Sequence, residues 1–411
     1  MISVQLAVVI LSPPEDGCGL ILDKDLAGLS PLKRLLLTLQ GAGVKEILII
    51  HKDLDELKLN SLKNEYASDS RVRCKLHWQN KKDFSKHYSS ELTGSQPFLL
   101  THGNIVTTEK VIENFVKTAT NDSTCTKSVL TLLRAPEQAS RICLIPPDNF
   151  NLLEQYIQKG VIESDAKGMF LSDPDFLVWE INTCSDLRDA ENWILKQYRK
   201  HHSQFMDKWF NSIFSIQLSK IFVKTPVTPN QLTVFGLVFG LVSGWFFARG
   251  SYWNGVCGGI FLAITAVWDC CDGDVARLKY MQSDFGDTLD TWCDNLINLF
   301  AFTGIMLGVS RDQGIHQALI PFFILLLGAA LILVLIYYPK GGKGVFFKGT
   351  KAFAVIEVLA SRNFIYIILL FAVMGRLDFF LWLAGYGSMA FALWLYIVKQ
   401  KIKRAGLTFK S

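Results

Sequence analysis

The sequence predicts a multidomain chain, with an N-terminal α/β domain followed by a C-terminal all-α bundle of six transmembrane helices. Two observations predict this division of the 411 residues. Short apolar runs alternate with amphipathic stretches up to about residue 198, whereas every long apolar run lies after about residue 230. The mean hydropathy of +0.26 is high for a soluble protein and low for a fully embedded one, as expected for an average over two such parts.

The composition excludes several classes of protein. Half of the residues are hydrophobic and only 19% are charged, which excludes a disordered chain. The nine cysteines are scattered, odd in number and without zinc-ligand spacing, so we expect neither a disulfide framework nor a structural zinc site, and a reducing compartment. Residues 1–14 lack a basic region and a cleavage site, so we expect a buried first strand rather than a signal peptide. At a net charge of only +5 we expect no nucleic-acid partner.

Residues 1–200 are predicted to form a cytoplasmic α/β domain. The predicted strands are 4–11, 46–51, 97–101, 129–133 and 176–181. The predicted helices are 32–42, 108–119, 151–159 and 185–200. Because helices separate the strands, we expect a largely parallel sheet.

Residues 201–224 are predicted to form an amphipathic helix in the membrane interface. Apolar residues recur there at helical spacing, with Lys208 and Lys220 among them. The alternative is a soluble helix that packs on the first domain. The following Thr228-Pro229-Asn230 is typical of a cap that leads into the first membrane helix.

Residues 225–405 are predicted to form the membrane domain. Its six apolar segments are 232–249, 252–271, 286–308, 317–338, 363–376 and 378–398. Each is long enough, or nearly so, to cross a hydrocarbon core of roughly 30 Å, and the fifth is the shortest. Lysine and arginine concentrate in alternate connections and in the C-terminal tail. By the positive-inside rule, both termini and the N-terminal domain face the cytoplasm.

Four carboxylates lie at the ends of the second and third predicted membrane helices. Asp269 and Asp272 are three residues apart, and Asp290 and Asp294 are four apart, so each pair projects from one helical face. Antiparallel neighbouring helices let the two pairs converge. Carboxylates near membrane depth are costly and indicate a function. An all-oxygen site of this kind predicts Mg²⁺ or Mn²⁺.

The spacing Asp269-x₂-Asp272-Gly273-x₂-Ala276-Arg277-x₈-Gly286-x₃-Asp290-x₃-Asp294 resembles the signature of the CDP-alcohol phosphotransferase (CDP-alcohol phosphatidyltransferase) family, with every fixed position filled. The resemblance covers about residues 225–400. It implies an integral membrane enzyme that transfers a phosphoalcohol from a CDP-linked donor to an acceptor hydroxyl and releases CMP. The product would be of the phospholipid or inositol-phosphate type, and membrane lipids would surround the domain.

The resemblance also implies roles for individual residues. Asp269, Asp272 and Asp290 would be metal ligands, and Asp294 would be a ligand or, preferably, the general base, so that Asp290 and Asp294 are the catalytic pair. The nucleotide contacts would be Asp272, Gly273, Ala276, Arg277 and Gly286. A structural ion pair with an aspartate is the alternative role for Arg277. Asp274, Asp284 and Asp287 lie outside the signature and are expected to be solvated.

Two further features of the membrane half have open interpretations. Lys343, Lys351 and Arg362 would form an acceptor-binding pocket, or else only reflect the positive-inside bias. Gly236, Gly240 and Gly244 form a small-residue stripe. Such a stripe favours tight packing within the bundle, with a homodimer as the alternative.

The N-terminal domain resembles a sugar-phosphate nucleotidyltransferase of the GT-A-like kind. The resemblance rests on 26–32, 42–47, 97–103 and 179–191. Fusions of inositol-1-phosphate cytidylyltransferase with di-myo-inositol phosphate phosphate synthase have this arrangement. Active relatives have an arginine and a Pro-Lys pair after the first strand and two metal-binding aspartates, whereas this chain has neither the arginine nor the Pro-Lys pair in 12–19, and has Asn104 and Asn182. An amide lacks the charge that a divalent ion requires.

We therefore expect a catalytically degenerate N-terminal domain. The alternative is a bifunctional enzyme whose first domain also makes the CDP-alcohol from CTP and an alcohol phosphate. A third class, a transporter or a purely structural membrane protein, is compatible with six helices, but the intact signature argues against it.

Overall fold

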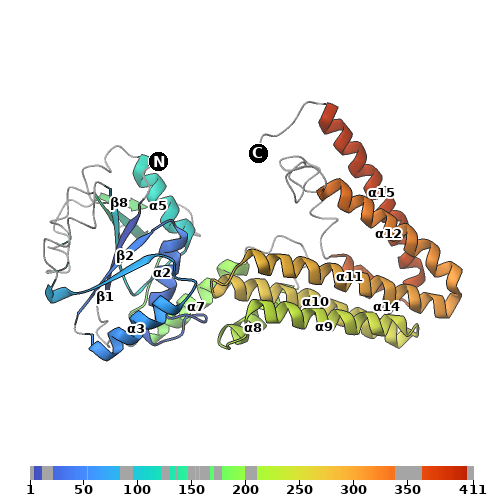
Figure 1. Cartoon of the computed structure of the whole chain (residues 1–411), viewed down its shortest axis with the longest axis horizontal. Helices are drawn as coiled ribbons and strands as arrows, with labels where there is room; N and C mark the ends of the chain where they lie inside the picture. The colour runs from blue at the N-terminus through green and yellow to red at the C-terminus, as the bar shows by residue number, and fades with distance from the viewer. Residues whose placement is uncertain are drawn as a thin grey trace. The chain divides into compact units, whose positions relative to one another are not determined.

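The structure is a computed structural model. It describes residues 4–11, 22–52, 54–83, 96–121, 130–135, 138–146, 153, 157, 167–170, 178–199, 211–337 and 363–404. The chain divides into two compact units, Met1–Gln197 and Tyr198–Ser411, and each is described by itself below (Figure 1).

The N-terminal unit is built on a seven-stranded sheet with the order β3-β2-β1-β4-β7-β6-β8. The strands are β1 Leu6–Leu11, β2 Glu46–His51, β3 Lys75–Asn80, β4 Phe98–His102, β6 Leu130–Ala135, β7 Gln138–Ile145 and β8 Lys167–Phe170. The first four are parallel to one another, β7 is antiparallel to β4 and β6, and β8 is parallel to β6. The expectation of a largely parallel α/β sheet is confirmed.

Apolar side chains of the central strands alternate between two hydrophobic clusters, one on each face of the sheet. Ala7 and Val9 of β1 belong to one cluster, and Leu6 and Val8 to the other. This alternation is the two-residue period of a strand that is buried on both faces. The helices of the unit are α2 Pro31–Gly41, α3 Glu56–Ser68, α5 Glu109–Asn121 and α7 Cys184–Arg199, and a 3₁₀ turn spans Lys81–Asp83.

The predicted elements and the observed ones differ at the edge of this sheet. The sequence indicated neither α3 nor β3. Only Leu62 and Tyr66 of α3 are buried, so the helix lacks a clear apolar stripe. The predicted strand 176–181 is the two-residue β9, Trp179–Glu180, which pairs with β5, Ile105–Val106, in a separate ladder. Of the predicted helix 151–159, only residues 153 and 157 lie within the described part of the chain.

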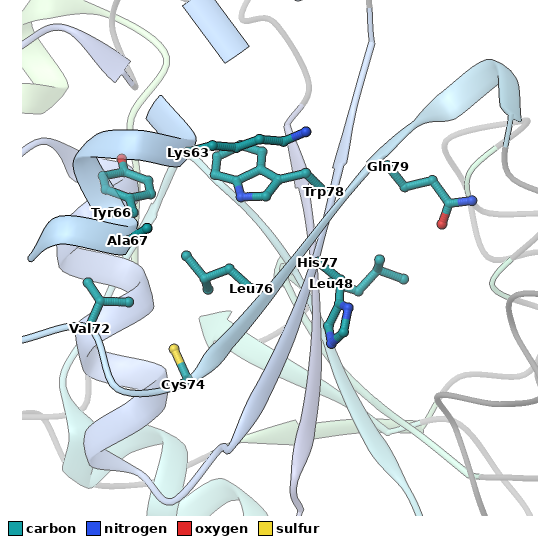
Figure 2. Close-up of a pocket in the computed structure, with 10 residues that line it drawn as sticks. All are labelled: Leu48, Lys63, Tyr66, Ala67, Val72, Cys74, Leu76, His77, Trp78 and Gln79. Atoms are coloured by element: carbon teal, nitrogen blue, oxygen red, sulfur yellow. The ribbon is translucent and has the colours of Figure 1, made fainter. Parts of the chain in front are cut away.

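A pocket of about 700 Å³ lies between α3 and β3 (Figure 2). Tyr66 and Trp78 stack beside it with ring centroids 6.1 Å apart. Burial raises the pKa of Tyr66 to about 12, because the phenolate form would lose its hydration. None of the residues that the sequence analysis singled out lines this pocket.

The C-terminal unit is helical. Its helices are α8 Ser212–Val223, α9 Pro229–Ala248, α10 Tyr252–Leu278, α11 Asp284–Gln313, α12 Ile315–Tyr337, α14 Phe364–Val373 and α15 Leu377–Arg404. In the described part of the chain, five of them (α9, α10, α11, α12 and α15) are long and apolar enough to cross a bilayer. The chain is therefore an integral membrane protein.

The predicted count of six membrane helices is wrong by one. The fifth predicted segment, 363–376, forms the ten-residue α14. Ten residues rise only about 15 Å along a helix axis, half of a hydrocarbon core of roughly 30 Å. The helix ends at Val373, and Gly375 then reverses the chain with a φ of +66°.

The first membrane helix begins with a complete capping box. The Thr228 hydroxyl accepts from the Gln231 N–H, and the Gln231 side chain accepts from the Thr228 N–H. Pro229 occupies the first turn, where its missing N–H costs nothing. The cap predicted at Thr228-Pro229-Asn230 is confirmed.

The glycine stripe of α9 packs inside the bundle. Gly236, Gly240 and Gly244 are buried. A Cβ at Gly244 would lie 3.3 Å from the Phe300 Cβ, and one at Gly236 would lie 3.5 Å from the Trp268 ring. Gly304 of α11 approaches the Gly244 backbone in turn, so both helices lack side chains where they meet. These glycines therefore serve close packing of α9 against α10 and α11.

An interfacial helix is predicted over 201–224. Within this range the structure describes α8, Ser212–Val223, and residues 201–210 lie outside the described part. The buried face of α8 carries Ser212, Ser215 and Ser219 and packs against α10. Its exposed side chains include Ile213, Phe214 and Ile221, each at least half exposed. A helix in contact with lipid is expected to present small polar residues to the protein and large apolar residues outward, as α8 does.

Candidate active site

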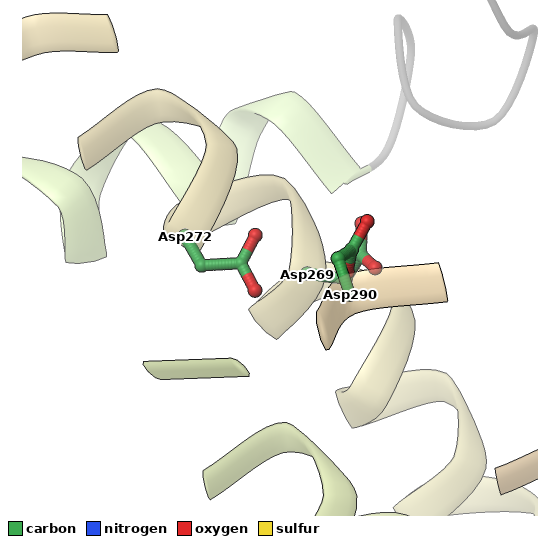
Figure 3. A group of neighbouring side chains, drawn as sticks. All are labelled: Asp269, Asp272 and Asp290. Carbon is green, nitrogen blue, oxygen red and sulfur yellow. The ribbon is translucent and has the colours of Figure 1, made fainter. Parts of the chain in front are cut away.

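Three aspartates from two helices meet at one end of the bundle (Figure 3). Asp269 and Asp272 lie on α10 and Asp290 lies on α11, and each offers a carboxylate oxygen within 4.8 Å of the other two. We call these three residues the carboxylate cluster. The predicted convergence of the two pairs thus holds for Asp269, Asp272 and Asp290.

The turn between α10 and α11 brings the cluster together. The Met281 N–H donates to the Ala276 carbonyl at 2.8 Å, and Tyr280 adopts a φ of +54°. Ser283 caps α11 by accepting from the Gly286 N–H at 3.0 Å. The two helices therefore run antiparallel, with the signature positions at the shared end.

Asp294 lies one helical turn beyond Asp290 on α11. Its carboxylate is close enough to Asp272 and Asp290 to interact electrostatically with both. It is not among the three residues whose ligand atoms group within 4.8 Å. The fourth predicted carboxylate is thus beside the cluster rather than in it.

The donor set of the cluster fits a hard divalent cation. Asp272 is 7% exposed, and like charges this close in a partly buried site repel one another strongly. A bound cation removes that repulsion, and Mg²⁺ and Mn²⁺ prefer carboxylate oxygens. The neighbouring Cys271 thiol instead faces backbone carbonyls of Val267 and Ser215.

Thr233 of α9 orients the cluster from a second helix. Its buried hydroxyl donates to Asp272 Oδ2 at 2.7 Å. The sequence did not indicate this residue, because one threonine in an apolar helix carries no spacing signal that points to a particular aspartate.

Asp274 was expected to be solvated, but the structure buries it. It is 2% exposed, and its Oδ1 accepts from Arg277 Nη2 at 2.8 Å. The expectation fails because position 274 lies on the face of α10 that α8 covers. Arg277 therefore forms an ion pair with an aspartate, but one outside the signature. Asp284 and Asp287 are exposed, as expected.

Three small signature residues lie within about one helical turn of the cluster aspartates along α10 and α11: Gly273, Ala276 and Gly286. A Cβ at Gly286 would lie 3.2 Å from both Asn230 Oδ1 and Ser283 Oγ, and one at Gly273 would lie 3.3 Å from Arg277 Nη2. Ala276 is half-buried. The predicted acceptor residues Lys343, Lys351 and Arg362 lie outside the described part of the chain.

Two amides meet in the N-terminal unit at the positions where the sequence analysis placed metal-binding aspartates in active nucleotidyltransferases. Asn104 follows β4 and Asn182 follows β9. Asn104 Nδ2 donates to Asn182 Oδ1 at 3.0 Å, and the Ile181 N–H donates to the Asn104 carbonyl at 2.9 Å. The structure thus brings the two residues together as a hydrogen-bonded amide pair, and Asn104 Nδ2 also lies 3.5 Å from the Glu180 carboxylate oxygen Oε1.

Comparison with known families bears on the membrane half. Residues 226–398 match the family model of CDP-alcohol phosphatidyltransferases, and the signature and the carboxylate cluster lie inside that range. The C-terminal part of this chain is a CDP-alcohol phosphatidyltransferase domain.

Curated proteins similar to this chain include three kinds of synthase. A bifunctional IPC transferase and DIPP synthase from Aquifex aeolicus is 28% identical over 229 residues, 54% of this chain and 50% of that protein. An archaetidylinositol phosphate synthase from Pyrococcus horikoshii is 35% identical over 92 residues, 22% of this chain and 47% of that protein. A phosphatidylinositol phosphate synthase from Corynebacterium glutamicum is 31% identical over 118 residues, 28% of this chain and 52% of that protein. The chain spans about half the length of these relatives.

Solved structures similar to the chain include HddC from Yersinia pseudotuberculosis, with a TM-score of 0.34, 12% identity, and coverage of 46% of this chain and 99% of that one. A UDP-glucose pyrophosphorylase from Acinetobacter baumanii has a TM-score of 0.34, 8% identity, and coverage of 49% and 95%. At these TM-scores the likenesses decide nothing about the N-terminal unit, whose α/β class rests on its own sheet.

Proposed function

We propose that the chain is a metal-dependent CDP-alcohol phosphotransferase that moves a phosphoalcohol from a CDP-linked donor to an acceptor hydroxyl and releases CMP. The observation that carries the proposal is the carboxylate cluster, which lies at signature positions within a CDP-alcohol phosphatidyltransferase domain. The names of the relatives support an inositol-phosphate or phospholipid product.

Asp269, Asp272 and Asp290 would hold Mg²⁺ or Mn²⁺, with Asp294 as a further ligand or the general base. Such an ion, when bound, neutralises the diphosphate of the donor and orients the leaving CMP. Thr233 supports this site by fixing one oxygen of Asp272.

The remaining residues of the site act on the substrates directly. Asp294 accepts the proton of the acceptor hydroxyl, which requires a base within hydrogen-bond reach of the attacking oxygen. Gly273, Ala276 and Gly286 leave room for the nucleotide beside the helices. The planar fork of Arg277 can bind phosphate oxygens. Lys343, Lys351 and Arg362 would bind the acceptor.

The orientation in the membrane is part of the same proposal. The lysine and arginine bias supports an orientation with the N-terminal unit and the C-terminus in the cytoplasm. The CDP-linked donor would then meet the carboxylate cluster from the cytoplasmic side, with membrane lipids around the apolar helix faces.

CMP release by purified full-length protein in lipid tests the proposal. We expect release with CDP-diacylglycerol or CDP-inositol as donor and an alcohol from a panel of acceptors, in the presence of Mg²⁺ or Mn²⁺. Chelation with EDTA should abolish release, and added Mn²⁺ should restore it, because the cluster has only carboxylate ligands to offer. Release that is unchanged in EDTA would show that the metal is not required.

The bifunctional alternative predicts a second reaction in the N-terminal unit. Relatives named bifunctional favour it, whereas the Asn104–Asn182 amide pair opposes it, because the two amides bring no charge for a nucleotide-bound cation. We expect no pyrophosphate release above background when the full-length protein is given CTP, Mg²⁺ and an alcohol phosphate. Release that Asn104→Ala removes would establish the alternative instead.

A further inference from the structure

We propose that Asp274 is a positioning residue, which holds the Arg277 guanidinium in place for the diphosphate of the donor, and that Ser215 of α8 holds Asp274 in turn. Neither Asp274 nor Ser215 belongs to the signature. The inference rests on the proposed function and adds to it a device that sets affinity for the nucleotide end of the donor.

Asp274 and Arg277 form an ion pair whose two side chains differ in exposure. The Asp274 side chain is only 4% exposed, whereas that of Arg277 is 29% exposed, and Nη2 of the arginine lies 2.8 Å from Oδ1 of the aspartate. A buried carboxylate keeps its charge only with close compensation. Asp274 is therefore the fixed member of the pair, and Arg277 is the member that solvent and ligands can reach.

The guanidinium of Arg277 lies next to the carboxylate cluster along α10. Arg277 Nε is buried and has no hydrogen-bond partner among the residues that the structure describes. The guanidinium also lies over Gly273, where a Cβ would be 3.3 Å from Nη2. Gly273 follows Asp272 of the carboxylate cluster directly. An anionic group bound at the cluster would thus lie beside a partly exposed guanidinium, whose planar fork suits phosphate oxygens.

Asp274 is hydrogen-bonded to helix α8. Its second oxygen, Oδ2, accepts from the Ser215 hydroxyl at 3.3 Å, and Ser215 is fully buried. The same end of α10 is tied to the connection between α8 and α9, because Lys279 Nζ donates to the carbonyls of Thr225 at 2.6 Å and Val227 at 3.0 Å. One carboxylate thus connects the arginine to a helix that carries no signature residue.

Because of these contacts, we expect Asp274 to have a different role from the aspartates of the carboxylate cluster. Arg277 and Ser215 each contact one oxygen of Asp274, and Asp274 is not one of the three aspartates of the carboxylate cluster. Its loss should therefore weaken binding of the CDP group more than it slows the transfer step, and should leave acceptor binding nearly unchanged. A merely structural role would lower the amount of folded protein without separating donor from acceptor.

The test compares Asp274→Asn with Asp284→Asn, a control at an exposed aspartate in the first turn of α11. We expect Asp274→Asn to raise the donor KM and the Kd of CDP, measured calorimetrically with Mn²⁺, on the order of tenfold. The acceptor KM should stay within about twofold, as should all constants of the control. In an Arg277→Gln background, Asp274→Asn should have no further effect on the donor KM, because the two residues act as one unit.

Ser215→Ala provides a second variant in case Asp274→Asn does not fold. It removes one hydroxyl and leaves the ion pair, so we expect a rise in the Kd of CDP of roughly twofold to fivefold. Equal CDP affinity in the wild type and these variants would overturn the inference, as would additive effects of Asp274→Asn and Arg277→Gln. A third outcome is possible: the wild type binds CDP, Asp274→Asn weakens that binding, and no donor gives CMP release. This outcome would overturn the proposed function alone. Absence of CDP binding by the wild type would overturn both.

Discussion

Asp290→Asn should lower the rate of CMP release on the order of a thousandfold or more. The substitution keeps the size of the side chain but removes one of three negative charges whose oxygens lie within 4.8 Å of one another. An amide oxygen is a weaker ligand for a hard divalent ion, so Mn²⁺ affinity should fall together with the rate. The measurement is CMP release at saturating donor and acceptor, alongside Mn²⁺ binding followed by calorimetry.

The matched control for this prediction is Asp287→Asn. Asp287 lies on the same helix, one turn before Asp290, and is exposed. Its variant should retain nearly full CMP release. Full activity of Asp290→Asn, or an equal loss in both variants, would contradict the assignment of Asp290 to the metal site.

Asp294→Asn distinguishes the two roles left for the fourth carboxylate. If Asp294 is the general base, its variant should lose CMP release while Mn²⁺ binds nearly as in the wild type. If it is a ligand, Mn²⁺ affinity should fall as in Asp290→Asn. Its place beside the cluster rather than within it favours the first outcome.

Gly304→Ala should destabilise the membrane unit by about 1–3 kcal/mol or more, the usual cost of overpacking. The added methyl would press on the Gly244 carbonyl oxygen and lie 3.0 Å from Gly244 Cα, and this backbone cannot rotate away as a side chain can. Helices α9 and α11 would have to separate at this point. The measurement is the thermal unfolding midpoint of the purified protein in detergent.

Gly387→Ala is the matched control for the packing prediction. Gly387 lies in α15, and a Cβ there has no neighbour within 4 Å. The same substitution should leave stability unchanged or raise it by about 0.5–1 kcal/mol, because alanine favours a helix over glycine. Equal unfolding midpoints for Gly304→Ala and the wild type would show that α9 and α11 do not pack as closely as described.

The sequence predicted those parts of the site that follow from spacing along one helix. Asp269 and Asp272 share a face of α10 because they are three residues apart, and the short turn to α11 brings Asp290 to them. Thr233 and Asp274 could not be predicted in this way. Their contacts depend on how α9 and α8 pack against α10, and spacing within one helix does not encode the neighbour that a side chain meets.

The fold shows the same limit of sequence patterns. The strand 46–51 was predicted with its observed bounds, because a run of buried apolar residues marks a central parallel strand. The edge strand β3 is half-buried and lacks such a run. In the membrane unit, hydropathy predicted an apolar segment over 363–376. It did not predict that α14 ends at Val373 and that the chain reverses at Gly375.

The match to the family model begins at residue 226, three residues after α8 ends. The compact unit, however, begins at Tyr198, and α8 supplies both the hydroxyl that Asp274 accepts from and the serine face against which α10 packs. A chain shortened to the matched range would therefore uncover the buried Asp274 carboxylate. Any dissection of the two halves, or exchange of one N-terminal unit for another, has to cut upstream of α8 to keep the membrane unit whole.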